Sequence, residues 1–183
     1  KHRFEFDEPA GGCYDGGVVE YSSNGGANWY DILSGEGDND PSTTANQPRF
    51  LQGAYNGTLN GAESNPLGAR AAYCNSSGGA FQTVRVDLGD FAGQNVRFRW
   101  RLGTGFQVGA TGWNLDDFLI NAGTGDALLA DNVEAGGGNF SPTGTASVTP
   151  WSIATNFASS ASHSWYVPGA GVVSDQVLTL GQS

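Results

Sequence analysis

The chain has 183 residues and a formal net charge of −10, from 18 acidic against 8 basic side chains. An acidic surface repels phosphate backbones, which excludes nucleic acid as an expected partner, and no apolar run reaches the about 18 residues of a membrane-spanning segment. Glycine supplies 29 residues and methionine none. Alternating apolar runs without a long helical period predict one all-β domain, a sandwich or barrel. The chain starts without Met inside an expected strand, so we expect a piece of a longer, processed protein.

The first part of the chain predicts strands joined by tight turns. Residues 1–7 alternate apolar and polar side chains, as a strand with one buried face does. Two further strands are predicted at 18–22 and 28–32, and the hairpin between them at Asn24-Gly25-Gly26 uses residues that tolerate positive φ. The acidic stretch 33–45 does not match the spacing of an EF-hand loop, and we expect it to be a solvated surface loop.

Residues 49–75 have a weak pattern and predict a long excursion over one edge of the sheets. Regular alternation resumes at 81–88 and is clearest at 96–102, where one face is apolar and the other carries three arginines. Such a row can bind a ligand, but we favour a structural ladder that neutralises acids of neighbouring strands. The acids expected as partners are Glu5, Asp7 and Asp87.

The stretch 112–120 (GWNLDDFLI) predicts a strand that crosses the core. Because successive side chains of a strand point to opposite faces, Asp116 and Asp117 cannot both face solvent. A buried carboxylate needs a metal ion, a hydrogen-bond donor or a cation. The pair therefore indicates either a calcium site or an inward acid held by backbone amides or an arginine.

The later part of the chain begins after a Gly/Thr linker at 121–126, with no change of composition that would indicate a second type of domain. Short strands are expected around 146–148, 151–153, 164–166 and 175–180. The two cysteines, Cys13 and Cys74, lie in Gly- or Ser-rich loops. They indicate a disulfide in a secreted protein, the alternative being two free thiols in a cytosolic one.

Several motifs in order resemble a family of extracellular jelly rolls. They are DGGVVEYS at 15–22, NGG at 24–26 followed by Trp29, AGQNVRFRWR at 92–101, and the acidic-pair strand. The relatives are MAM-like domains, reelin subrepeats and the β-sandwich modules attached to immune-inhibitor-A-type and other secreted bacterial metallopeptidases. Jelly-roll carbohydrate-binding modules are more distant. The resemblance implies a jelly-roll β-sandwich of two antiparallel sheets.

The resemblance also implies a calcium site. The sequence DNVEAG at 131–136 is similar to the family's first-strand motif D-x-F-E-x-G, with Val133 in place of the usual aromatic residue. It implies that Glu134 and an acid of the pair Asp116 and Asp117 share a calcium ion. Two carboxylates with loop carbonyls and water supply the hard oxygen ligands that Ca²⁺ takes.

The order of these motifs departs from the family. The first-strand motif, within 122–143, lies after the later strands of 1–121, and 144–183 reads as the early strands. We therefore expect residues 1–183 to form a single, circularly permuted jelly roll. The alternative is a fragment of a tandem array with half a unit at each end, which would pair between molecules as a domain-swapped dimer.

The function expected from sequence is a non-catalytic, calcium-stabilised, secreted module of a larger multidomain protein that binds a glycan, a cell surface or an extracellular protein. A structural spacer or adhesive repeat without a ligand is the alternative. A hydrolase has the weakest support, because no nucleophile elbow or zinc-binding helix motif is present. Aromatic residues could stack on sugars or pack in the core. The candidates are Tyr14, Tyr55, Tyr73, Trp151 and Trp165.

Overall fold

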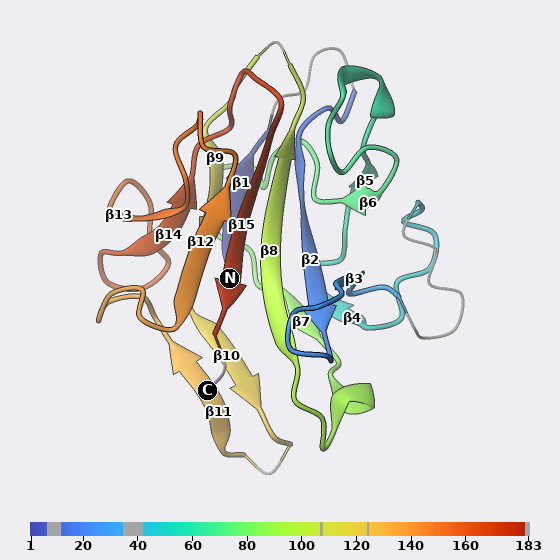
Figure 1. Cartoon of the computed structure of the whole chain (residues 1–183). Coiled ribbons are helices and arrows are strands. Elements are labelled where there is room, and N and C mark those ends of the chain that lie inside the picture. The colour runs from blue at the N-terminus through green and yellow to red at the C-terminus, as the bar shows by residue number, and fades with distance from the viewer. Residues whose placement is uncertain (7–11, 35–41, 107, 124, 182–183) are drawn as a thin grey trace.

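The computed structural model describes residues 1–6, 12–34, 42–106, 108–123 and 125–181, and it is nearly all β (Figure 1). The five-stranded sheet has the order β12 (Phe140–Gly144), β15 (Ser174–Leu180), β8 (Arg97–Thr104), β2 (Gly16–Ser22) and β3 (Tyr30–Asp31). The four-stranded sheet has the order β1 (His2–Glu5), β9 (Gly112–Leu115), β14 (Ser164–Val167) and β13 (Ser152–Ala154). All pairs are antiparallel, which confirms the predicted all-β sandwich.

Smaller elements surround these sheets. Three two-stranded sheets pair β4 (Phe50–Gln52) with β7 (Arg85–Val86), β5 (Gly57–Thr58) with β6 (Ala71–Ala72), and β10 (Phe118–Asn121) with β11 (Ala127–Asp131). The helical elements among the described residues are two 3₁₀ turns, η2 (Gly61–Glu63) and η3 (Gly89–Phe91). Within the described residues no helix has the length and apolar character to cross a membrane. The acidic stretch 35–41 and Asp7 lie outside the described residues.

Strand β8 shows how alternation separates the two faces of the five-stranded sheet. Phe98 and Leu102 are buried in the core, while on the other face Arg99 and Arg101 lie against acids and Arg97 donates to the Gly25 carbonyl. Arg99 Nε donates to Glu20 at 2.5 Å, and Arg101 binds Asp175 through two hydrogen bonds of 2.7 and 2.6 Å. The row is thus the structural ladder that the pattern predicts.

Two of the three partners predicted for that ladder, Glu5 and Asp87, were wrong, and the third, Asp7, lies outside the described residues. Glu20 and Asp175 replace Glu5 and Asp87, because β2 and β15 are the strands that flank β8. Glu5 lies in the four-stranded sheet instead. The alternation of a single strand reveals which face is polar, but it does not reveal which strands lie beside it.

The core lies between the two sheets and is rich in aromatic rings. Trp113 of β9 is fully buried, with its ring centroid 5.7 Å from that of Trp151 and 5.9 Å from that of Phe6. Gly17 is required beside it, because a Cβ there would lie 2.3 Å from the Trp113 ring. Burial of such large rings supplies most of the apolar area that stabilises a sandwich.

The excursion at 49–75 covers one end of the outer face of the five-stranded sheet. Asn65 donates from Nδ2 to the carbonyl of Gly103 at 2.9 Å, and a Cβ on Gly103 would lie 2.3 Å from Asn65 Oδ1. Arg70 from the same segment binds Glu20 and Asp31, each at 2.6 Å. This loop is therefore packed onto the sheet through both its backbone and its charges.

The predicted disulfide is confirmed. Cys13 and Cys74 are bonded, with 5.5 Å between their Cα atoms, and among the described residues no free cysteine remains. The bond joins the chain just before β2 to the chain just after β6. It closes a loop across a sequence separation of 61 residues.

Both sheets combine strands from the early and the late part of the chain, which lie side by side as two groups in each sheet. Strand β14 pairs with β9, and β15 lies between β12 and β8 (Figure 1). Strand β15 does not pair with β1, which lies in the other sheet. Residues 127–180 thus complete both sheets begun by residues 2–121, while the permuted order relative to other jelly rolls stays a prediction.

Two local predictions differ from the structure. The expected strand at 112–120 is two strands, β9 and β10, because Asp117 has a φ of 50° and breaks the extended backbone. The expected strand at 146–148 is a turn, and the strand lies earlier, at β12. The expected linker at 121–126 contains the turn of the β10–β11 hairpin.

Candidate functional site

Asp116 is the inward acid of the pair and is fully buried. Its carboxylate accepts hydrogen bonds from the backbone N–H groups of Asp117 at 2.7 Å, Ser159 at 2.7 Å and Ser160 at 3.0 Å. A buried carboxylate with several amide donors is well satisfied, and charge-assisted bonds of this kind are strong. This is the arrangement that the sequence offered as the alternative to a metal ion.

Asp117 lies nearer the surface and binds the side chain of Lys1. Its Oδ2 lies 2.8 Å from Lys1 Nζ and accepts from Ser159 Oγ at 2.9 Å. Burial acts to raise the pKa of Asp117, but the hydrogen bonds from Lys1, Ser160 and Ser159 outweigh it, so its pKa is lowered. The Asp117 carboxylate is therefore ionised and already has a cationic partner.

Glu134 binds the other end of the same loop. Its Oε1 accepts from the N–H groups of Ser162 at 3.0 Å and His163 at 2.7 Å, and its Oε2 lies 2.9 Å from His163 Nδ1. These contacts, the His163 side chain first, lower the pKa of Glu134 to about 2. Glu134 and Asp116 therefore hold the loop 159–163 in place from two sides.

The three acids do not fit a calcium ion in this arrangement. Amide N–H groups and the Lys1 ammonium already bind the carboxylate oxygens that a cation would need as ligands. Within the part of the chain that the structure describes, no three His, Cys, Asp or Glu side chains lie close enough to hold a metal. Calcium binding stays a prediction from the family resemblance, and it requires Lys1 and loop 159–163 to move away.

The predicted sugar-stacking residues are mostly in the core. Tyr55, Tyr73, Trp151 and Trp165 are only 3, 2, 1 and 5% exposed, so none presents a ring face to solvent. Burial raises the pKa of both tyrosines well above the usual value. Tyr14 alone is partly exposed. The ligand-binding prediction is thus wrong for these four residues, because large rings supply the area that the core needs.

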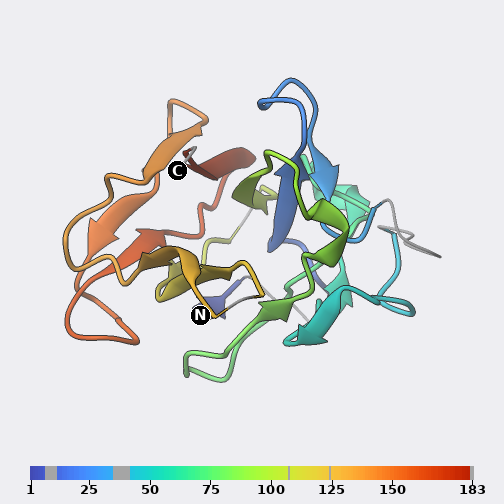
Figure 2. The same cartoon turned by 90° about the horizontal axis from the view of Figure 1, so that it is seen from below.

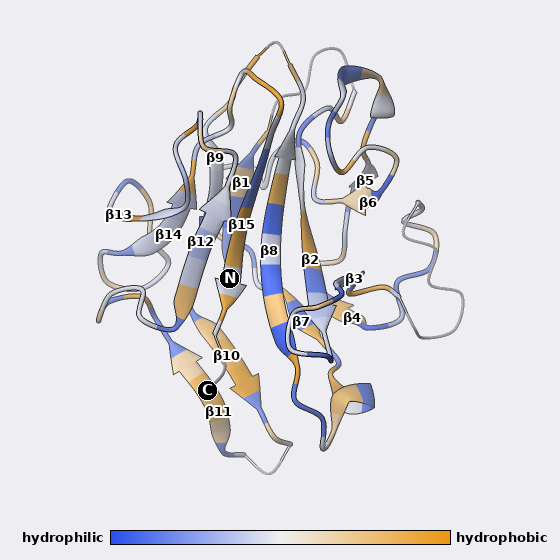
Figure 3. Ribbon diagram, in the orientation of Figure 1, coloured by the Kyte–Doolittle hydropathy of each residue, from blue (hydrophilic) through white to orange (hydrophobic). Residues whose placement is uncertain are grey.

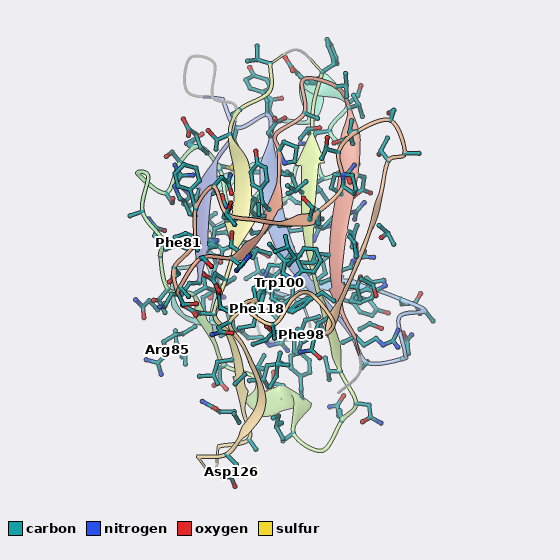
Figure 4. The ribbon with its side chains drawn as sticks, turned by 90° about the vertical axis from the view of Figure 1, so that its left-hand side faces the viewer. Phe81, Arg85, Phe98, Trp100, Phe118 and Asp126 are labelled. Carbon is teal, nitrogen blue, oxygen red and sulfur yellow. A yellow bond between two sulfur atoms is a disulfide. The ribbon has the colours of Figure 1, made fainter. Side chains whose placement is uncertain are left out.

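A cleft of about 1890 Å³ lies at one end of the sandwich. The β10–β11 hairpin forms one wall and segment 83–96, which contains β7 and η3, forms the other (Figures 1 and 2). Figure 4 shows Trp100 and Phe118 together in the middle of this region, and their ring centroids lie 5.0 Å apart. The apolar residues that line the cleft include Val84, Val86, Phe98, Trp100, Phe118 and Leu119.

The cleft has a mixed lining, and its apolar side chains extend to the rim. Leu51, Leu119 and Leu128 line it and are 60, 62 and 62% exposed. Figure 3 shows the same character in the orange colour of β10. Exposed apolar side chains that lie together on a surface mark interaction sites, whereas single exposed ones are ordinary.

His2 is the polar group in the buried wall of the cleft. The indole N–H of Trp113 donates to His2 Nδ1 at 3.4 Å, so the neutral ring carries its proton on Nε2. Burial lowers the pKa of His2 to about 3, which keeps the ring neutral. Its buried Nε2 has no partner among the described residues, although a buried donor ordinarily finds one.

Sequence reasoning missed this cleft. Leu119 and Leu128 flank a Gly/Thr turn, and that pattern could have indicated an exposed apolar hairpin. The cleft between the hairpin and segment 83–96 depends on how segments far apart in the sequence pack together. The local hydrophobic pattern carries no information about that packing.

Fold and cleft together define an all-β sandwich domain with an apolar cleft at one end. A scan against protein-family models finds no match, and searches of curated proteins and of solved structures find none either. The resemblance to MAM-like and reelin-type jelly rolls therefore rests on the motifs alone.

Proposed function

We propose that this chain is a non-catalytic, extracellular binding module whose ligand enters the cleft. The observation that carries the proposal is the cleft itself, about 1890 Å³, with large apolar side chains among its lining residues. Typical small-molecule pockets measure roughly 300–1,000 Å³, so the cleft suits an extended or chain-like ligand. A segment of a partner protein therefore fits the cleft better than a compact metabolite does.

The contacts of the two histidines support a non-catalytic role. His163 uses the same atom, Nδ1, for Ser162 and for Glu134, both at 2.9 Å. A serine nucleophile needs the ring nitrogen opposite to the one that the acid orients. His2 is buried in the core, and its Nδ1 accepts a hydrogen bond from Trp113. Neither ring therefore combines an orienting acid with a nucleophile.

The disulfide supports the extracellular part of the proposal. Disulfides form and persist in oxidising compartments and are rare in the cytosol. Cys74 is fully buried, and a Cβ on Gly57 would lie 2.6 Å from its sulfur. The bonded pair is thus packed into the fold.

A glycan is the competing ligand. Tyr30 is 47% exposed, and Trp29 lies over the Arg99 guanidinium, 4.3 Å from ring centroid to Arg99 Cζ. This pair lies on β3 and its hairpin, outside the cleft. Binding at the two places is separable by substitution.

The apolar fluorescent probe ANS, titrated into the folded protein, tests the proposal. We expect Leu119→Asp to weaken ANS binding, because a carboxylate at the cleft opposes apolar ligands and repels the sulfonate group of ANS. Val172→Asp is the matched control, since Val172 is 49% exposed and lies outside the cleft. A glycan panel provides the competing arm. Glycan binding that Tyr30→Ala removes, together with ANS binding that Leu119→Asp leaves unchanged, would contradict the cleft as the binding site.

A further inference from the structure

The cleft continues the line of β1. At His2, the strand β1 lies between two neighbours: His2 pairs with Leu115 on one side and with Gln82 on the other. The backbone bonds on the Gln82 side are 3.0 and 2.7 Å, and on the other side Asp116 N–H donates to the Lys1 carbonyl at 2.9 Å. Three antiparallel segments thus lie side by side up to this point.

Past the N-terminal end of β1, the two neighbouring segments continue and form the walls of the cleft. The segment after Gln82 becomes Thr83–Val86, and the segment after Asp116 becomes β10. Among the described strands, β10 pairs with β11 alone and β7 with β4 alone. The space between them therefore lies where a strand in line with β1 would pass, and an unpaired strand edge of this kind is a template for another strand.

We propose that the cleft takes an extended polypeptide strand supplied by a second protein, bound antiparallel to β10 and running in the same direction as β1. This inference rests on the proposed function and names its ligand class. Alternate apolar side chains of the strand would enter the sandwich towards Phe98, Trp100 and Phe118, and the side chains between them would face outwards. This is recognition by β-strand addition.

A strand fits the walls better than an acyl chain does. The free edge of β10 presents backbone N–H and C=O groups, and a lipid tail would leave them without partners in an apolar space. Because the chain carries a net charge of −10, basic residues that flank the apolar core of the strand would favour association.

The test uses a blocked synthetic peptide of valine alternating with threonine, with a lysine at each end. Amide hydrogen exchange, followed by NMR on the whole chain, reads out strand addition directly. We expect the peptide to slow exchange at amides within Phe118–Asn121 by about tenfold or more, as a new hydrogen-bonded edge does. A peptide of the same composition with N-methyl groups on its hydrogen-bonding edge is the control, and we expect it to give no protection.

Direction and location are checked separately. A spin label at the peptide's C-terminus should broaden signals of His2 and Gln82, and one at its N-terminus should broaden Asn121. Leu119→Lys should weaken peptide binding about tenfold, since it places a charge at the apolar rim of the cleft and repels the lysines of the peptide, and Val172→Lys should not. The opposite labelling pattern would overturn the proposed direction.

The possible failures are distinguishable. Palmitate or ANS binding in the cleft, with no protection of β10 by the peptide, would overturn strand recognition and leave the proposed function intact. If neither peptide nor apolar probe binds at the cleft, both the inference and the proposed function fall. A dimer of the free chain with β10 amides protected in a concentration-dependent way would identify a second copy as the strand donor and overturn a different protein as the source.

Discussion

At the scale of single residues, the acids singled out by the sequence anchor a loop. One acid of the pair Asp116 and Asp117 was expected to face inwards, and Asp116 is the buried one, while Glu134 was expected to share a calcium ion with the pair. Asp116 and Glu134 instead both bind loop 159–163, whose backbone amides take the place of a shared cation. Periodicity could indicate the buried acid, but its partners come from a loop more than 40 residues further along the chain, as the Ser159 and Ser160 contacts show.

We therefore predict that these acids stabilise the fold without calcium. EDTA should leave the melting temperature unchanged, because Lys1 and amide N–H groups already satisfy the carboxylates. Asp116→Asn should destabilise the protein by about 1–3 kcal/mol, since it removes an acceptor from buried N–H donors. Calorimetry with and without EDTA measures both effects, and Asp126→Asn at the exposed hairpin tip is the control (Figure 4). A fall in melting temperature with EDTA would favour the calcium prediction instead.

At the scale of elements, alternation predicted strands well and their limits poorly. The polar row of β8 and its apolar row were both readable from residues 96–102. The break between β9 and β10 was not, because nothing in the apolar pattern records that Asp117 has a positive φ. That break sends the chain out of the four-stranded sheet and makes the wall of the cleft. The candidate site therefore depends on a backbone feature that side-chain periodicity does not reveal.

The disulfide is the element-scale constraint whose effect is easiest to measure. Replacing both Cys13 and Cys74 by Ala should lower the free energy of unfolding by roughly 4 kcal/mol, since the bond closes a long loop of the unfolded chain. Urea denaturation measures the change. A reducing agent should destabilise the natural chain to a similar extent and leave the double variant unaffected. Equal stability of the two proteins under oxidising conditions would show that the packed loop, and not the bond, holds this region.

At the scale of the whole molecule, both halves of the chain are needed for either sheet. Strand β8 is flanked by β2 from the early part and β15 from the late part, and β9 by β1 and β14. The motif order indicated this arrangement, because the late segment read as the beginning of the same kind of domain. What the order could not show is that the resulting sandwich leaves a cleft beside β10.

The last prediction concerns reassembly from two pieces. Residues 1–121 alone would expose the edges of β8 and β9 and the apolar faces behind them, so we expect this fragment to aggregate or remain unfolded. Mixed with residues 122–183 under oxidising conditions, it should regain the circular dichroism and the near-ultraviolet tryptophan signal of the intact chain, because β14 and β15 restore the missing partners. The complex should contain one copy of each piece by light scattering. A cooperative melt of 1–121 by itself, unchanged by the second piece, would show that the late strands are not part of the same folding unit.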